Sequence, residues 1–194
     1  FKGVLGIGAK DKPRVRLRNG DVLHAMILAG DDKALRVQSA LLGELSIKND
    51  MLLGVVFPIV EPPAEAAIAQ FFAEPDPRQD QFLTPRGESV GCFLERFTDT
   101  ELAVDVAGQK RSLPLNQVAA FRYAALKPFP PAQGVQALVR LGDGSLLSGA
   151  LKDFAADKLS LVAPDGTAWS LPAAAIRSIG FKGGKLVFLS DLEP

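Results

Sequence analysis

The most regular feature of the chain is a pattern of short apolar runs separated by tight-turn residues, and this pattern occurs three times. In each copy an Asn-Gly, Arg-Gly or Asp-Gly step precedes an apolar run, with the glycine at Gly20, Gly87 and Gly144. Tight hairpin turns favour glycine at such steps because its backbone adopts positive φ without strain. The apolar strands that follow these turns are expected at residues 22–28, 90–97 and 146–151.

The spacing inside the three segments indicates an internal repeat. The turn glycine and a closing aromatic residue are 37, 36 and 37 positions apart in the pairs Gly20 and Phe57, Gly87 and Tyr123, and Gly144 and Phe181. An aliphatic residue lies 10 positions before each closing aromatic residue, at Ile47, Leu113 and Leu171. Such a repeat is a supersecondary unit that packs on its neighbours, so it organises the whole fold.

Each repeat is expected to contain about five short strands. Leu102, Val104 and Val106 alternate with other residues, which is typical of a half-buried strand. The last strand is expected at 118–123 in the second repeat and at 176–181 in the third, and a short turn of the 3₁₀ type is expected before it.

Short, bent strands close most easily into a small barrel. One unit of about 40 residues buries little surface by itself. We therefore expect the units to pack together and share strand edges, either as three closed barrels or as one array.

The expected fold class is all-β, with three tandem small five-stranded barrels of the SH3 or Sm type and one short connecting helix. The helix is expected at 64–73, where Ala67, Ile68, Phe71 and Phe72 share one face. Residues 1–5 are expected to add a strand to the first unit. The expected domains are repeat 1 at 1–60, a linker with the helix at 61–81, repeat 2 at 82–126, a Pro-rich linker at 127–134 and repeat 3 at 135–194.

Composition narrows the function classes. The 194 residues include 22 basic and 22 acidic side chains, and a balanced charge argues against nucleic-acid binding, which needs a basic surplus. One cysteine excludes an intrachain disulfide framework and a multi-cysteine zinc site, and one histidine excludes a His-rich metal cage. No apolar run reaches about 18 residues, so we expect no membrane span. We expect no cofactor, no metal and no catalytic residue.

The chain begins at Phe1 and stops after a strand-like run, so we expect it to be a fragment of a longer protein.

Few residues are candidates for chemistry. His24 lies in an apolar strand with no partner at the spacing of a ligand set or a catalytic triad, and we expect a structural role. Cys92 lies between apolar residues and is expected to be buried and inert. The acidic residues at 31–32 and 153–157 lack the spacing of a calcium loop, so they are expected to be solvated turn residues. A pair of carboxylates spaced for glycoside hydrolysis is an alternative among the dispersed acids.

Two further features point to binding surfaces. Trp169 is a weak candidate for ligand binding because sugars stack on exposed aromatic rings, and the alternative is packing at a seam between repeats. Arg14, Arg16 and Arg18 alternate with apolar residues, so one face of a strand could bind an anionic polymer. The alternative for these arginines is an edge strand whose charges prevent aggregation.

The segment LGDGSLLSGAL at 141–151 resembles the small barrels of the Sm-like and SH3-like families. Sm-like barrels bind RNA through an acidic loop with Asn and through an Arg-Gly turn. The corresponding loops here, at 155–157 and 174–177, lack both features. The resemblance therefore implies the fold and carries over no binding residue.

A second resemblance covers nearly the whole chain. It is carried by residues 39–47, by the Pro-Pro linker and helix that follow Phe57, and by residues 184–194. In these stretches the chain resembles the N-terminal region of planctomycete proteins with a C-terminal NPCBM/NEW2 domain, a carbohydrate-binding module. The resemblance implies an exported, extracytoplasmic protein, periplasmic or secreted, whose glycan or cell-surface polysaccharide partner binds a downstream domain that is absent from this chain.

These observations lead to one functional expectation and two alternatives. We expect a non-catalytic structural or interaction module that presents or spaces the downstream carbohydrate-binding domain. One alternative is direct glycan binding in grooves between the units. The other is an Sm-like module for nucleic acid or protein. The ligand, the oligomeric state and the arrangement of the units are open at this stage.

Overall fold

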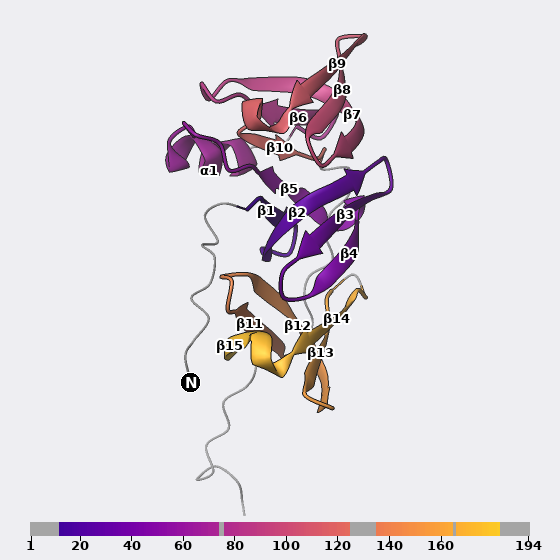
Figure 1. Ribbon diagram of the computed structural model, residues 1–194, viewed down its shortest axis with the longest axis vertical. Coiled ribbons are helices and arrows are strands. Elements are labelled where there is room, and N and C mark those ends of the chain that lie inside the picture. The colour runs from indigo at the N-terminus through magenta and orange to yellow at the C-terminus, as the bar shows by residue number, and fades with distance from the viewer. Residues whose placement is uncertain (1–11, 74–75, 125–134, 165, 183–194) are drawn as a thin grey trace, which may run out of the picture.

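The computed structural model describes residues 12–73, 76–124, 135–164 and 166–182. Fifteen strands are hydrogen-bonded into one antiparallel sheet system, and the only α-helix in the described ranges is α1 (Glu65–Ala73). The expected all-β character is confirmed. The strands form one array that shares edges, with three groups of strands stacked along the longest axis of the molecule (Figure 1).

The strands fall into three groups of five, which we call units 1, 2 and 3. Unit 1 comprises β1 (Arg14–Leu17), β2 (Val22–Gly30), β3 (Ala34–Ser39), β4 (Gly43–Lys48) and β5 (Leu52–Val56). Unit 2 comprises β6 (Asp80–Leu83), β7 (Ser89–Thr98), β8 (Glu101–Val106), β9 (Gln109–Pro114) and β10 (Ala120–Arg122). Unit 3 comprises β11 (Gln136–Leu141), β12 (Leu146–Ala155), β13 (Lys158–Val162), β14 (Ala168–Pro172) and β15 (Ile176–Lys182).

The three units have the same strand order. In each, the first strand pairs with the second and the fifth, and the second, third and fourth strands pair in sequence. A register shift recurs at one place in the second strand, between Ile27 and Ala29, Leu94 and Arg96, and Leu151 and Asp153. Residues that occupy the same place in this shared register are called equivalent below.

The local predictions from the turn residues hold. Gly20, Gly87 and Gly144 have φ of 93°, 85° and 91°, which is the left-handed region that glycine adopts without strain. A 3₁₀ turn precedes the last strand of every unit, at Asn49–Met51, Leu115–Gln117 and Ala173–Ala175. The helix begins one residue after the expected 64, and β6 begins at Asp80, inside the stretch expected to be linker. The expected strand at 1–5, the linker at 127–134 and the stretch 184–194 lie outside the described residues.

Units 1 and 2 are joined by two strand pairings. β5 pairs with β10 so that Val55 lies opposite Phe121, and the end of β2 pairs with the end of β7 so that Gly30 lies opposite Phe97. Each of these pairs joins two equivalent positions, so the junction has approximate two-fold symmetry. Together with the pairings inside each unit, the two contacts close a ring of six strands, in the order β2, β1, β5, β10, β6 and β7.

The interior of this ring contains a chain of four aromatic side chains. Phe97 lies between Phe57 and Phe121, with ring centroids 6.2 Å and 5.2 Å apart, and Phe121 contacts Tyr123 at 5.0 Å. The last two contacts are edge-to-face, a favourable geometry for aromatic rings. All four side chains are buried. The closing aromatic residues of the first two repeats therefore form a core that belongs to both units.

Unit 3 contacts unit 1 by a smaller and more polar junction. Leu146 of β12 lies opposite its equivalent, Val22 of β2. Asp21, which is 2% exposed, accepts hydrogen bonds from the backbone N–H of Ser148 at 2.8 Å and from its hydroxyl at 2.6 Å. In the reciprocal contact, the N–H of His24 donates to the hydroxyl of Ser145 at 3.0 Å. This junction is also nearly two-fold. Val22 and Leu146 are equivalent, and because Ser145 is equivalent to Asp21 and Ser148 to His24, the two hydrogen-bonded contacts are counterparts of each other.

Helix α1 covers the strands where units 1 and 2 meet. Its apolar face consists of Ile68, Phe71 and Phe72, as the sequence predicts, and these residues pack on β5, β10 and β6. Arg16 lies over the ring of Phe72 and Arg122 over the ring of Phe71, each with the guanidinium carbon 4.6 Å from the ring centroid. Gly54 lies beneath, and a Cβ there would collide with the Phe121 carbonyl and the Phe72 ring.

Candidate functional site

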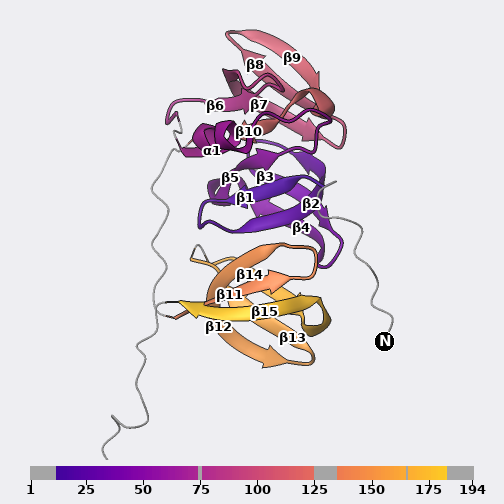
Figure 2. The same cartoon turned by 90° about the vertical axis from the view of Figure 1, so that its left-hand side faces the viewer.

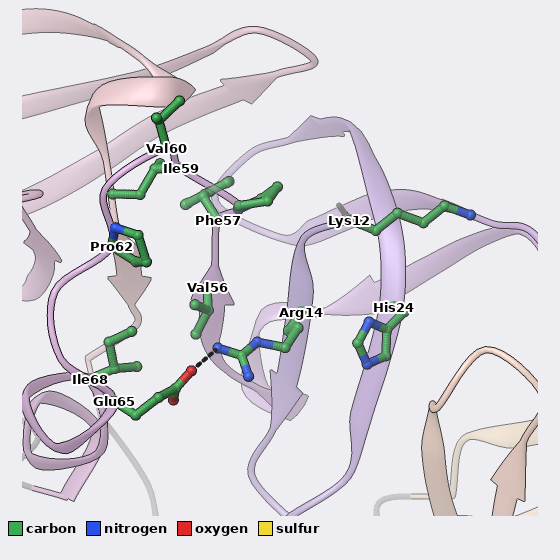
Figure 3. A pocket seen from close by; sticks show the side chains of 11 residues that line it. Lys12, Arg14, His24, Val56, Phe57, Ile59, Val60, Pro62, Glu65 and Ile68 are labelled. Atoms are coloured by element: carbon green, nitrogen blue, oxygen red, sulfur yellow. Dashed lines mark hydrogen bonds and ion pairs between the residues drawn. The ribbon is translucent and has the colours of Figure 1, made fainter. Parts of the chain in front are cut away.

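A pocket lies between unit 1 and the segment that leads into α1. Its volume is about 660 Å³. Lys12, Arg14 and His24 line it from the side of β1 and β2, and Glu65 comes from the start of α1. The remaining wall is apolar and consists of Val56, Phe57, Pro58, Ile59, Val60, Pro62 and Ile68. Figure 3 shows Arg14 and Glu65 reaching toward each other across this pocket, with His24 beyond Arg14 in that view.

The strand pattern explains why these side chains meet. In β1, Val15 and Leu17 are fully buried, and alternation turns Arg14 and Arg16 to the opposite face, toward α1. His24 pairs with Arg14 across β1 and β2. Both edges of β1 are paired, with β2 and with β5, so the edge-strand interpretation of these arginines is wrong.

Positive charge exceeds negative charge around the pocket. Arg14 donates to Glu65 at 3.3 Å, and both side chains are substantially exposed. The pKa of Arg16, which lies beside a second hollow that also borders Arg14 and Glu65, is lowered, first by burial and then by repulsion from Arg14. The two hollows together are bordered by two arginines, one lysine and one carboxylate. Such a site favours an anion, with apolar groups of the ligand against Val56 and Ile68.

The pocket contains few groups suited to bond making or breaking. Its lining supplies one imidazole, from His24, and one carboxylate, from Glu65. General acid–base chemistry needs such groups positioned against a reacting atom, and Glu65 is paired with Arg14. The arrangement is therefore suited to holding a ligand by charge and shape.

The other sequence candidates lie away from this pocket. Trp169 is 4% exposed and belongs to the main core, with β14 paired to β13 at Leu161. Cys92 is buried as expected, and burial raises the pKa of its thiol to about 12. Asp31 is exposed and accepts hydrogen bonds from the N–H groups of Lys33 and Ala34, as expected for a turn residue. A ligand role for Trp169 stays a prediction, and a sugar could stack on its ring only if β14 moved.

Sequence reasoning found the arginine stripe but missed the pocket beside it. Lys12 is far in the sequence from Pro62 and Ile68, and only the packing of α1 against unit 1 brings them to one pocket. The only available signal was the Pro-Pro step at 62–63 next to the amphipathic helix. Pro-rich connectors are semi-rigid, so they restrict where the following helix can lie.

Two kinds of feature are absent from the described ranges. No cluster of three or more His, Cys, Asp or Glu side chains that could hold a metal ion occurs there. No helix of the described part of the chain has the length and apolar character needed to cross a membrane.

Comparisons with known proteins identify no relative. No protein-family model, no curated protein and no solved structure matches the chain.

Proposed function

We propose that this chain is a non-catalytic spacer and interaction module built from three SH3-like or Sm-like barrel units. The observation that carries the proposal is the sharing of strand edges. Unit 1 pairs with unit 2 through β5–β10 and β2–β7, and with unit 3 through β2–β12. Units joined by backbone hydrogen bonds and by buried side chains hold a fixed relative orientation better than units on a flexible tether. Figure 2 shows the resulting stack from the side.

The identity of the domain that the module presents is proposed from the resemblance alone. A stack of this kind would present a downstream carbohydrate-binding domain and hold it at a set distance from the far end of the stack, outside the cytoplasm. Its partner would then be a glycan or a cell-surface polysaccharide, bound by that domain. The module needs no cofactor for this role.

Rigidity is the property to test. Two spin labels, at Arg111→Cys in unit 2 and Lys158→Cys in unit 3, report the distance between the ends of the stack. Both positions are exposed, and Cys92 stays unlabelled at neutral pH because it is buried with a raised pKa. Samples diluted with unlabelled protein report distances within one chain only. We expect one narrow distance distribution. A broad or multiple distribution would show that the units move independently and would overturn the spacer function.

A second candidate function is direct binding of an acidic glycan, and the pocket favours it. Arg14 and Lys12 would meet a carboxylate, as in a uronic acid, while Val56 and Ile68 would contact the apolar face of the sugar ring. The experiment is binding of the chain to neutral and acidic polysaccharides at low and moderate salt. We expect salt-sensitive binding to acidic members only, weakened at least about tenfold by Arg14→Ala.

The matched control for Arg14→Ala is Arg36→Ala. Arg36 forms a similar exposed ion pair, with Glu44 at 2.9 Å, on strands away from the pocket. Equal losses of binding in both variants would mean that the polysaccharide responds to the overall charge of the protein and not to the pocket. Binding to single-stranded nucleic acid instead of glycans would favour the Sm-like alternative.

A further inference from the structure

Unit 3 exposes the apolar surface that units 1 and 2 bury against each other. Ile179 is equivalent to Val55 and Phe121, and it is 43% exposed where they are 0% exposed. Phe181 is 65% exposed, and its equivalents Phe57 and Tyr123 are 4% and 7% exposed.

The same contrast holds at the second strand of the unit. Phe154, near the end of β12, is 61% exposed, whereas its equivalent Phe97 is 2% exposed. Leu151 on the same strand is 48% exposed. Unit 3 therefore presents, on β15 and on the end of β12, the two sites by which units 1 and 2 are joined.

One edge of β15, which borders this surface, also has no paired strand among the described residues. Among the described residues β15 pairs only with β11, although its equivalents β5 and β10 each have strands on both sides. An exposed, apolar edge strand is a ready site for pairing with another strand, and folded proteins rarely leave one uncovered.

We propose that this surface forms a homodimer, in which unit 3 of one chain pairs with unit 3 of a second chain. The argument rests on the internal junction of units 1 and 2, in which equivalent residues lie opposite each other. A surface that joins equivalent positions about a two-fold axis is self-complementary, and this is the requirement for a two-fold homodimer. The junction of units 1 and 2 therefore serves as the template for the proposed dimer interface.

The shared register fixes which residues meet. By analogy with Val55 and Phe121, Ile179 lies opposite Ile179 of the other copy, and Ser178 lies opposite Gly180. By analogy with Gly30 and Phe97, the two Phe154 residues meet, and Asp153 lies opposite Ala155. No like charges oppose each other in this register, which would weaken a strand pair.

The aromatic side chains of unit 3 would also fill the interior of the ring of strands that the dimer forms. The ring formed by units 1 and 2 encloses four aromatic rings, from Phe57, Phe97, Phe121 and Tyr123. Two copies of unit 3 would supply the same number, from Phe154 and Phe181 of each chain. Two Phe154 rings can meet as an offset or edge-to-face pair at the crossing of the β12 strands.

The test is the oligomeric state of the full chain, measured by sedimentation or light scattering at concentrations up to about 100 µM, where an interface of standard size associates. We expect twice the chain mass of 20.6 kDa. Ile179→Lys introduces two like charges at the two-fold axis and is expected to weaken dimerisation at least about tenfold. The control is Phe93→Lys, because Phe93 is also 58% exposed but lies on unit 2.

A cysteine variant tests the register. Opposed Cα atoms in an antiparallel pair lie about 4.5–5.5 Å apart, within the range that a disulfide spans. Ile179→Cys is therefore expected to crosslink two chains on mild oxidation. In Arg177→Cys the two sulfur-bearing residues would be four positions apart, roughly 13 Å along the strand, and should not crosslink.

Each outcome decides the proposal. A monomer at all concentrations would overturn it and would mean that another part of the protein or a different partner covers β15. A dimer that is unaffected by Ile179→Lys, or that crosslinks equally through Arg177→Cys, would overturn it by placing the contact elsewhere. Far-ultraviolet circular dichroism and thermal unfolding of each variant show whether unit 3 remains folded.

Discussion

The two junctions of unit 1 differ in chemistry although the repeat that builds them is the same. Toward unit 2, the contact is a double strand pairing over a core of aromatic side chains. Toward unit 3, it is a single residue pair supported by hydrogen bonds around the buried Asp21. Apolar burial scales with area and resists local change, whereas a buried polar contact depends on every partner being present. One structural repeat is thus joined to its two neighbours by two different kinds of contact, one apolar and one polar.

The largest expected effect comes from opening the aromatic junction. Phe121→Ala removes a fully buried ring that contacts both Phe97 and Tyr123, and it should lower the free energy of unfolding by about 3–5 kcal/mol. Urea denaturation measures this quantity. Phe93→Ala is the matched control, since Phe93 is exposed and should change stability by less than about 1 kcal/mol. Similar losses in the two variants would contradict a shared core at this junction.

A smaller effect is expected at the polar junction. Ser148→Ala removes the hydroxyl that donates to Asp21 and leaves part of a buried carboxylate without a partner, a loss of about 1–3 kcal/mol. Hydrogen exchange should show faster exchange in unit 3 and little change in unit 2.

The control for this comparison is Ser112→Ala. The Ser112 hydroxyl donates to Glu101 at 2.8 Å, but both groups are exposed, so the loss should be below about 0.5 kcal/mol. If Ser148→Ala weakened unit 2 as much as unit 3, the two junctions would not be independent.

The smallest effect is a dependence on pH that comes from Asp21. Burial raises the pKa of this carboxyl above its unfolded value of 3.8, so the native state holds the proton more tightly than the unfolded state. The contribution of Asp21 to stability is therefore greatest below that value and declines as pH rises through the raised pKa.

Asp21→Asn cannot ionise, and its amide can still accept from the Ser148 N–H and donate to the Ser148 hydroxyl. The variant should therefore gain stability relative to the parent protein as pH rises above about 4, because only the parent loses the contribution of a protonated Asp21. Thermal unfolding across this range measures the gain. Exposed acids such as Asp31, whose pKa is lowered by hydrogen bonds to the backbone, are common to both proteins and cancel in the difference. A difference that does not change with pH would contradict the role of burial at Asp21.

Local chemistry determined the elements of this protein. Glycine at positions 20, 87 and 144 sets the hairpin turns, because positive φ excludes most other residues there. Alternation of apolar residues sets which face of each strand is buried, and the i, i+3, i+4 pattern sets the buried face of α1. The number of repeats, the strand positions and the 3₁₀ turns all follow from patterns of residues close in sequence.

Only the tertiary structure decided how the units are joined. Phe57, Tyr123 and Phe181 are the same landmark of the repeat, yet two are buried and the third is exposed, because the neighbour of each unit differs. The pocket likewise depends on where α1 packs, which brings Glu65 to Arg14 across 51 positions of sequence. Pairing between units joins residues far apart in the chain, and its energy depends on surfaces that exist only once each unit has folded. The alternation of apolar and polar residues along a strand indicates which side chains are buried, but it does not indicate against which unit they pack.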